Sequence, residues 1–354
     1  MSEEIITKIF LTVMVTFLFV AFFVPIIKKI AFHIGALDIP NARKVHTKPM
    51  PRLGGVAIYF GFLFSYMIFG EPSQTMNAVL IGSTIIIFTG MIDDIKPIKA
   101  SYKFIGQVIA ACVVAFYGQI LLKDISAFGL YIDFGIFTYP ITIFFIVACI
   151  NCLNLIDGLD GLAAGISAIY YITIGIIATI LGHLGTDVTL TFIMLGATLG
   201  FLVHNFHPAS IFAGDSGSMF MGFMISIIAL LGFKNVTLTS FIIPILILAI
   251  PILDTLFAIT RRLIKGERIS KPDKFHLHHQ LLNKNLSHRE TVLVIYLVDV
   301  LFAVASVVYV IGDRVLGYVI YSVLVIIVLL FVLKTNVIMD HDEFMKKLRN
   351  STKK

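Results

Sequence analysis

Acidic and amide side chains recur at every third position of NCLNLIDGLDGL, residues 151–162. They are Asn151, Asn154, Asp157 and Asp160, and the sequence on either side is apolar enough to lie in lipid. Ionisable groups are costly at membrane depth and usually mark a functional site. Carboxylate and amide oxygens suit Mg²⁺ or Mn²⁺, which bind through one or two carboxylates and share substrate phosphates. The pattern therefore indicates metal-dependent phosphoryl transfer at a membrane surface.

Four other polar motifs interrupt the apolar sequence. They are RKVHTKPMPRLGG with Lys48 and Arg52, GMIDDIKPIKASYKFIGQ with Asp93, Asp94 and Lys103, HNFHPASIFAGDSGSMFMG with Asn205, Asp215 and Ser218, and KPDKFHLHHQ with His276, His278 and His279. Histidine, lysine and arginine side chains suit a pyrophosphate, whose transfer depends mainly on positioning and charge neutralisation. Tight turns, in which backbone N–H groups can approach phosphate, are predicted at Gly158, Gly161, Gly214 and Gly217.

Each motif also has a simpler structural interpretation. Asp157, Asp160 or Asp215 could cap the helix that follows it, as short polar side chains commonly do. Asp93 and Asp94 could belong to an ordinary loop, and the histidines to a solvated one. Helix capping alone, however, does not require all five motifs to lie on the same side of a membrane.

The composition predicts an all-α polytopic membrane protein. Of the 354 residues, 58% are hydrophobic and 14% are charged, whereas soluble domains are about half apolar and a quarter charged. Apolar runs of about 20 residues, the length of a transmembrane helix, recur along the whole chain. About eleven spans are predicted, at residues 5–27, 53–70, 76–92, 104–120, 138–153, 161–182, 187–205, 217–233, 237–260, 291–311 and 315–334.

The basic residues predict how these spans are oriented. If the N-terminus lies outside, 23 of the 27 lysines and arginines fall on the cytoplasmic side, in segments 28–52, 96–103, 261–289 and 334–354. The four exceptions are Lys8, Lys123, Lys234 and Arg314. The C-terminus and all five polar motifs are then cytoplasmic, which predicts one active-site cleft on the cytoplasmic face. The net charge of +6 follows from this topology and from anion binding, without nucleic acid as a partner.

The whole sequence, residues 1–354, is predicted to form a single integral membrane domain. Its largest cytoplasmic loop is residues 261–290, and a cytoplasmic tail covers residues 335–354. The stretch LLKDISAFGLYIDFGIFTYP, residues 121–140, alternates enough to predict a small β-hairpin on the outer face. Pro244 and Pro251 predict a bend in the span at 237–260.

The five motifs, in this order, resemble the polyprenyl-phosphate N-acetylhexosamine-1-phosphate transferases, the membrane family that includes the muramoyl-pentapeptide-phosphate transferase of peptidoglycan synthesis. The resemblance extends from RKVHTKPMPRLGG to HLHHQLL and is strongest to the Gram-positive branch that initiates wall teichoic acid linkage. It implies a helical bundle in the bacterial plasma membrane with an inner-face cleft. It also implies Mg²⁺- or Mn²⁺-dependent transfer of a sugar 1-phosphate from a UDP-sugar to undecaprenyl phosphate, with release of UMP.

The resemblance further implies a role for each motif residue. Asp215 and Asn154 are expected to bind the metal, with the catalytic carboxylate of Asp157 close to them. Asp93 and Asp94 match the family's tandem catalytic acids near the lipid phosphate. The residues expected to contact the nucleoside, the sugar phosphate or the pyrophosphate are Phe212, Asn151, Asp160, Asn205, His276, His278, His279, Lys48, Arg52 and Lys103.

Several alternatives stay open. HLHH differs from the three adjacent histidines of the pentapeptide branch, which favours UDP-GlcNAc over UDP-MurNAc-pentapeptide, and another UDP-N-acetylhexosamine is a further option. A phosphomonoester has its second pKa at about 6, so the lipid phosphate needs no strong base; this favours one in-line displacement over a route through an aspartyl-phosphate. A secondary transporter would place its site near the midplane between repeated halves. An aspartate-rich prenyltransferase would need D-x-x-x-D pairs, and a CDP-alcohol transferase would need an arginine shortly after its D-G, which DGLDGLAAG does not have. Whether the chain forms a homodimer is also open.

Overall fold

The computed structural model describes residues 3–40, 48–127, 130–235, 242–264, 266 and 276–333. The chain separates into two compact units, Met1–Ile245 and Leu246–Lys354. Nearly all of the regular structure is helical, which confirms the all-α polytopic fold. Within a bilayer, helices satisfy every backbone hydrogen-bonding group inside the segment itself, and this explains why long apolar runs fold in this way.

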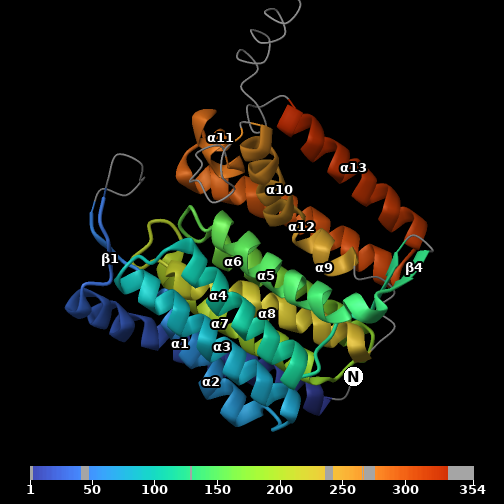
Figure 1. The fold of residues 1–354 in the computed structure, drawn as a ribbon, viewed down its shortest axis with the longest axis horizontal. Helices are drawn as coiled ribbons and strands as arrows, with labels where there is room; N and C mark the ends of the chain where they lie inside the picture. Colours follow the sequence, from blue (N-terminus) through green and yellow to red (C-terminus); the bar gives the residue numbers. More distant parts are fainter. Residues whose placement is uncertain are drawn as a thin grey trace, which may run out of the picture. The chain divides into compact units, whose positions relative to one another are not determined.

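The first unit is a bundle of eight helices that lie side by side (Figure 1). They are α1 (Glu3–Ile34), α2 (Gly54–Phe69), α3 (Gln74–Ile95), α4 (Ala100–Cys112), α5 (Thr138–Ile156), α6 (Leu162–Ile180), α7 (Thr186–Asn205) and α8 (Gly214–Asn235). A π-helical turn at Val113–Tyr117 extends α4, and a 3₁₀ turn at Gly135–Phe137 leads into α5.

Helix α8 is the centre of this bundle. Nearly all of its residues are buried, and it packs against α2, α3, α5, α6 and α7. Two glycines allow the close approach of its neighbours: a Cβ at Gly90 would collide with the backbone of Ser216, and one at Gly222 would lie 2.8 Å from the Cys149 carbonyl. The sequence therefore fixes α8 against α3 and α5 by backbone contact.

Two small antiparallel β-ribbons connect helices. The hairpin of β3 (Asp124–Ala127) and β4 (Leu130–Asp133) confirms the one predicted in residues 121–140. The second ribbon, β1 (Leu37–Asp38) with β2 (Met50–Pro51), was not predicted. Strands of two residues are too short to leave an alternating pattern in the sequence.

The second unit contains α10 (Ala249–Ile264), α11 (Leu277–Asn283), α12 (His288–Ile311) and α13 (Arg314–Leu333), and α9 (Ile242–Ile247) precedes α10. Helices α12 and α13 pack together, with a hydrogen bond of 2.7 Å from the Tyr321 hydroxyl to Ser306 Oγ. Ser287 and Glu290 form a capping box at the start of α12.

The helix boundaries agree with most of the predicted spans. Among the described residues, nine helices are long and apolar enough to cross a membrane. The span predicted at 53–70 corresponds to α2, which has only 16 residues. The span at 237–260 corresponds to α9 and α10, which are interrupted at Leu248. Pro251 has no N–H to donate to the Ile247 carbonyl, and this explains an interruption within the span where a bend is predicted. The count of eleven spans and their orientation remain predictions.

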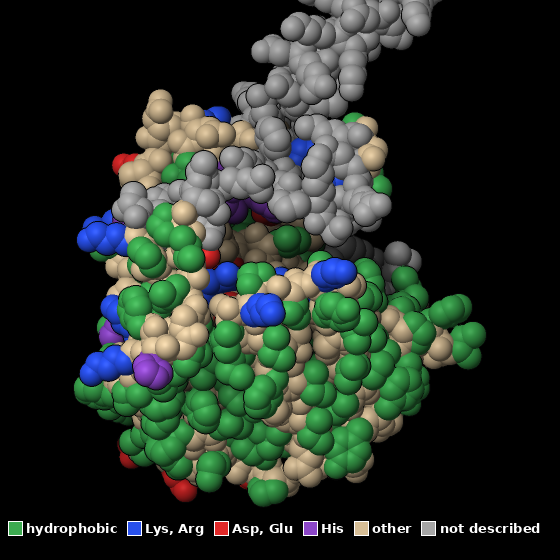
Figure 2. Space-filling view, turned by 60° about the vertical axis from the view of Figure 1, so that its left-hand side comes forward, with side chains coloured by type: hydrophobic (Ala, Val, Ile, Leu, Met, Phe, Trp, Pro, Cys, Tyr) green, Lys and Arg blue, Asp and Glu red, His purple; other side chains and the backbone are tan. Residues whose placement is uncertain are grey.

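The surface is that of a membrane protein. On the face drawn in Figure 2, hydrophobic side chains form a broad band, and lysine and arginine side chains gather along one edge of it. Large apolar side chains such as Phe22, Met67 and Phe144 are more than 70% exposed, as expected for residues that face lipid.

Candidate active site

Asp94, in the last turn of α3, caps the N-terminus of α8. Its carboxylate accepts hydrogen bonds from the backbone N–H of Asp215 (2.8 Å), the backbone N–H of Ser216 (3.1 Å) and the Ser216 hydroxyl (2.6 Å). The first N–H groups of a helix have no partner inside it and usually bond to a residue just before it. Here the cap comes from another helix, and it fixes the position of Asp215.

The turn into α8 requires glycine. Gly214 has a φ of 71°, and a Cβ at this position would collide with the Arg52 carbonyl and the Asp94 carboxylate. Glycine adopts this left-handed conformation without a steric penalty. The turn predicted at Gly214 is therefore present, and it allows Asp94 to reach the helix end.

Two cations hold the carboxylate of Asp215. Lys103 Nζ lies 2.7 Å from Asp215 Oδ2, and Arg52 Nη2 lies 3.4 Å from Asp215 Oδ1. Lys103 also lies 3.4 Å from Asp93 Oδ2, and Arg52 lies 3.5 Å from Asp94 Oδ1. We call Arg52, Asp93, Asp94, Lys103 and Asp215 the acid–base cluster. Three sequence motifs that are distant along the chain thus meet at one point.

Backbone hydrogen bonds tie the arginine to the aspartate. The Phe212 N–H donates to the Pro51 carbonyl (2.8 Å), and the Gly54 and Gly55 N–H groups donate to the carbonyls of Phe212 and Ala213 (2.9 Å each). The chain entering α2 therefore runs alongside the chain entering α8. Arg52 and Asp215 are positioned by this main-chain ladder.

Electrostatics at Arg52 are dominated by its acidic neighbours. Desolvation opposes its charge, but the carboxylates of Asp94, Asp215 and Asp38 outweigh it and raise the pKa of Arg52 above its ordinary value. Asp38, in β1, lies 3.5 Å from Arg52 Nη1. The guanidinium is permanently charged and held among carboxylates.

Asp93 orders the turn between α3 and α4. Its Oδ1 accepts a hydrogen bond of 2.9 Å from the Ile98 N–H, while its Oδ2 faces Lys103. Asp93 thus orients the lysine that contacts Asp215. The two adjacent acids have different partners, one at the α3–α4 turn and one at the start of α8.

Asn154 and Asp157 come from the end of α5. Asn154 Nδ2 donates to the Ser218 hydroxyl (2.9 Å) on α8. Asp157 follows the last residue of α5, and among the described residues no group donates a hydrogen bond to its carboxylate. Burial, and then the negative charge of Asp215, raise the pKa of Asp157 to about 7. A cation shared with Asp215 would stabilise the charged form of a carboxylate in this position.

Asn205 and Asp160 hold the loops beside α8 together. Asn205, at the end of α7, accepts from the Gly161 N–H (3.0 Å) and donates to the Ile211 carbonyl (2.9 Å). Asp160 Oδ2 lies 2.8 Å from His207 Nδ1 and accepts from the Ala209 N–H at 3.1 Å. Both predicted nucleoside residues therefore shape the loop that carries Phe212.

In the described part of the chain, neither Asn151 nor Lys48 is hydrogen-bonded to the acid–base cluster. Asn151 Nδ2 donates to Gln107 Oε1 (2.7 Å) and to the Val147 carbonyl (2.8 Å), which joins α5 to α4. Lys48 is exposed and forms no ion pair with any described residue. The residues before it, 41–47, lie outside the described part of the chain.

The three histidines belong to the second unit. His276 Nδ1 lies 2.8 Å from Asp254 Oδ2, and Asp254 Oδ1 accepts a hydrogen bond of 2.7 Å from the Leu277 N–H at the start of α11. The rings of His276 and His278 are parallel with centroids 5.8 Å apart, and those of His278 and His279 are 4.2 Å apart. Burial, and then the charge of His279, lower the pKa of His278 to about 3.

Several of these partners were not predicted from the sequence. Asp254 lies in an amphipathic run that ends in Arg261 and Arg262, and nothing in its spacing separates it from a helix surface residue. Asp38 and His207 stand in polar loops, and Gln107 stands alone in an apolar helix. His207 and Gln107 lie within two of the polar motifs and Asp38 lies shortly before another, which is the only signal in the sequence that could have identified them.

The side chains around Asp215 fit a divalent cation. Asp215 and Asp157 supply carboxylate oxygens. Asn154, whose amide nitrogen bonds to Ser218 on α8, adds an amide oxygen. Hard oxygen donors of this kind, few in number, match Mg²⁺ or Mn²⁺ that shares its shell with phosphate. The Asp157 carboxylate, to which no residue in the described part of the chain donates a hydrogen bond, is the observation that favours a cation here.

Comparison with known proteins shows what the chain is similar to. Residues 76–233 match the family described as glycosyl transferase family 4. The chain is 41% identical to the probable undecaprenyl-phosphate N-acetylglucosaminyl 1-phosphate transferase of Bacillus subtilis, over 87% of each protein. It is 34% identical to the decaprenyl-phosphate N-acetylglucosaminephosphotransferase of Mycolicibacterium smegmatis, over 77% of this chain and 74% of that protein. It is 30% identical to the undecaprenyl-phosphate alpha-N-acetylglucosaminyl 1-phosphate transferase of Escherichia coli, over 81% and 80%.

Proposed function

Because the chain belongs to glycosyl transferase family 4, we propose that it transfers GlcNAc-1-phosphate from UDP-GlcNAc to undecaprenyl phosphate. The products are UMP and undecaprenyl-diphosphate-GlcNAc. The relatives from Bacillus, Mycolicibacterium and Escherichia are all named for transfer of N-acetylglucosamine phosphate to a polyprenyl phosphate. The observation in the structure that carries the proposal is the carboxylate of Asp215 held between Lys103 and Arg52.

The chemistry that this geometry supports is charge neutralisation and positioning. Lys103 and Arg52 offer fixed positive charge to the phosphate oxygens of donor and acceptor. The lipid phosphate has its second pKa at about 6, so at neutral pH it is largely a dianion and needs no general base. One of its oxygens attacks the β-phosphorus of UDP-GlcNAc in line, and the bond from that phosphorus to the UMP oxygen breaks with its electron pair.

The metal of this reaction would be Mg²⁺ or Mn²⁺, and Asp215 and Asn154 would hold it with the catalytic carboxylate of Asp157 close to them. When bound, it supplies Lewis-acid neutralisation of the donor's diphosphate. The deprotonated form of Asp157 is the one that binds a cation, and a nearby dication would lower the pKa that burial and Asp215 raise.

Asp94 is a positioning residue in this scheme. Both of its oxygens accept hydrogen bonds from the first turn of α8, and a carboxylate occupied in this way is a poor nucleophile. This favours a single displacement over a route in which Asp94 becomes phosphorylated. Asp93 acts through Lys103, whose ammonium it helps to orient.

The remaining predicted contacts complete the proposal. The site binds the nucleoside through Phe212, Asn205 and Asp160, and Asn151 and Lys48 act at its periphery. His276, His278 and His279 bind the donor's diphosphate. The active site faces the cytoplasm of a bacterial cell, and the lipid product starts teichoic acid or a related cell-wall polymer. These assignments rest on the motif resemblance.

An assay of UMP release from purified protein tests the proposal. We expect turnover of UDP-GlcNAc only when undecaprenyl phosphate and Mg²⁺ or Mn²⁺ are both present. Equal turnover of UDP-MurNAc-pentapeptide would contradict the donor assignment. Activity that persists in EDTA would contradict the metal.

A further inference from the structure

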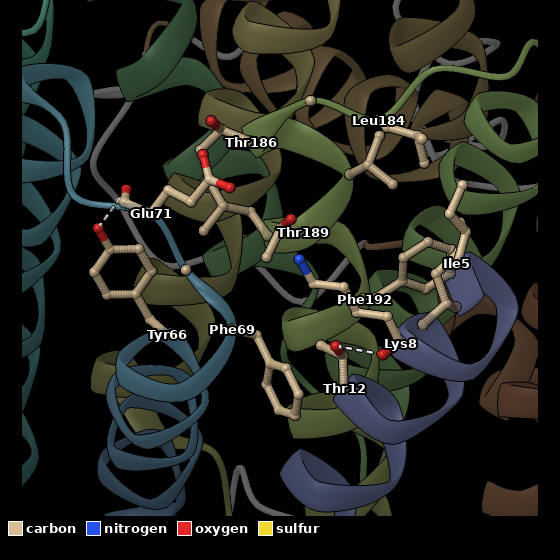
Figure 3. Close-up of a pocket in the computed structure, with 15 residues that line it drawn as sticks. Ile5, Lys8, Thr12, Tyr66, Phe69, Glu71, Leu184, Thr186, Thr189 and Phe192 are labelled. Atoms are coloured by element: carbon tan, nitrogen blue, oxygen red, sulfur yellow. Dashed lines mark hydrogen bonds between the residues drawn. The ribbon is translucent and has the colours of Figure 1, made fainter.

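A cavity of about 190 Å³ lies at the end of the first unit's bundle that is remote from the acid–base cluster. It is formed by the first residues of α1, the last turn of α2 with the loop after it, and the first turns of α7 (Figure 3). Helix α2 starts two positions after Arg52 and ends at Phe69, and its 16 residues correspond to about 24 Å along the helix axis. The cavity therefore lies at the opposite end of α2 from the acid–base cluster.

Two opposite charges face this cavity from different elements. Lys8 comes from α1 and directs its ammonium group toward Thr189, while Glu71 comes from the loop after α2 and directs its carboxylate toward Thr186 (Figure 3). Lys8 and Glu71 form no ion pair with each other or with any other described residue. The cavity thus presents one cation and one anion, on side chains that are both exposed.

The rest of the lining is suited to the region where a lipid headgroup meets its acyl chains. Thr186 and Thr189 add hydroxyl groups, and the Tyr66 hydroxyl donates to the Glu71 carbonyl at 3.0 Å, which ties the loop to α2. Ile5, Phe69 and Phe192 form apolar walls. Directly beside the lining residues, Ile6 and Met67 are exposed apolar side chains of the kind that face lipid.

We propose that this cavity binds the headgroup of a zwitterionic aminophospholipid, with the lipid phosphate on Lys8 and the primary ammonium on Glu71. A phosphate beside Lys8 gains a charge-assisted hydrogen bond, and so does an ammonium beside Glu71. An anionic lipid without an amine would leave Glu71 unpaired and close to negative charge. A choline lipid has no N–H to donate to the Glu71 carboxylate, so it satisfies only half of the site.

Native mass spectrometry of the purified, delipidated full-length protein tests the proposal. Phosphatidylethanolamine, phosphatidylcholine and phosphatidylglycerol with the same acyl chains are titrated separately, together with free phosphoethanolamine. We expect phosphatidylethanolamine to bind about tenfold more tightly than the other two lipids, the effect of one charge-assisted hydrogen bond. Free phosphoethanolamine should bind far more weakly, because it lacks the acyl chains.

Four variants test which side chains bind the lipid headgroup. Glu71→Gln should abolish the preference for ethanolamine over choline, and Lys8→Gln should weaken both lipids by about tenfold. Glu4→Gln and Lys123→Gln remove exposed charges that do not line the cavity, and they should bind lipid as the wild type does.

Three outcomes would overturn the proposal. The first is equal affinity of the wild type for the three lipids. The second is unchanged selectivity in Glu71→Gln, or unchanged affinity for both lipids in Lys8→Gln. The third is free phosphoethanolamine that binds as tightly as the lipid, which would assign the cavity to a soluble zwitterion. UMP release is measured in parallel on the same variants and should stay at the wild-type level, so failure here is separate from failure of the proposed reaction.

Discussion

The side chain of Asp94 accepts a hydrogen bond from the backbone N–H of Asp215 at 2.8 Å. Two acids 121 positions apart in sequence are joined in this way, the side chain of one to the main chain of the other. Asp94 has an exposed fraction of 3%, whereas the side chain of Asp215 is 15% exposed and faces two cations. Asp94 therefore holds the site together, and Asp215 is the acid whose side chain is available within it.

Asp94→Asn should destabilise the protein as well as inactivate it. The amide retains one acceptor oxygen, so at least one N–H at the start of α8 loses its partner, which corresponds to about 1–3 kcal/mol. Apparent melting temperature in detergent and UMP release are measured together. A variant that is inactive but as stable as the wild type would contradict the capping role.

Asp215→Asn should inactivate the enzyme with little loss of stability. Its backbone N–H still bonds to Asp94, and only the carboxylate charge is removed. We expect a steep fall in turnover and a higher Mg²⁺ concentration at half-maximal activity, where each tenfold loss in kcat/KM corresponds to about 1.4 kcal/mol. An unchanged Mg²⁺ dependence would remove Asp215 from the metal site.

The pH–rate profile distinguishes orientation from base catalysis. If the lipid phosphate attacks as a dianion, activity should fall below its second pKa of about 6, and the residual activity of Asp93→Asn should show the same acid limb. Loss of that limb in Asp93→Asn would identify Asp93 as the base. A phosphorylated aspartate trapped from UDP-GlcNAc without lipid would establish the two-step route instead.

The buried His278 should make the protein less stable in acid. Its pKa is about 3 in the folded protein against 6.5 for the exposed group, so the unfolded chain takes up a proton that the folded chain excludes. The contribution of the neutral His278 to the free energy of unfolding is therefore fully present above pH 6.5. It is lost as the pH falls toward 3, by at most about 1.4 kcal/mol for each pH unit. Apparent melting temperatures between pH 8 and pH 5 measure this slope.

His278→Phe should reduce that slope, and His33→Gln, at an exposed position on α1, should leave it unchanged. If the melting temperature of the wild type does not fall between pH 6.5 and pH 5, His278 is not held neutral by its surroundings.

Labelling of introduced cysteines tests the orientation of the chain. Lys274 lies outside the described residues, in the loop predicted to be cytoplasmic, and a cysteine there should react only with a reagent that enters the cell. A cysteine at Lys123, beside the β3–β4 hairpin, is the matched position predicted to face outward. The reverse pattern would overturn the topology that the lysine and arginine distribution predicts.

The membrane fold could be predicted from the sequence because it depends on composition. Apolar runs predicted most of the helices, and Pro251 and the alternating residues 121–140 predicted the break before α10 and the hairpin. The predicted span at 53–70 exceeds α2 by one residue at each end, because Leu53 and Gly70 are the residues that flank the helix and do not interrupt the apolar run.

The candidate site was readable only in part. Motif residues such as Asp93, Lys103 and Asp215 do converge. The sequence could not predict that Asp94 caps α8, because that contact depends on how two helices pack. Nor could it single out Asp254, whose bond to His276 bridges 22 residues. Residue type predicts the available chemistry, and the partner of each group comes from tertiary packing.

The backbone ladder between the chain entering α2 and the chain entering α8 has a mechanical consequence. Since Pro51, Gly54 and Gly55 bond directly to Phe212 and Ala213, the two segments should move as one rigid block. A Cβ at Gly55 would also collide with the backbone of Gly217, so no slack remains for one segment to slide past the other. Any opening that admits a long-chain lipid phosphate should therefore come from surrounding parts of the protein, while the backbones that carry Arg52 and Asp215 stay together.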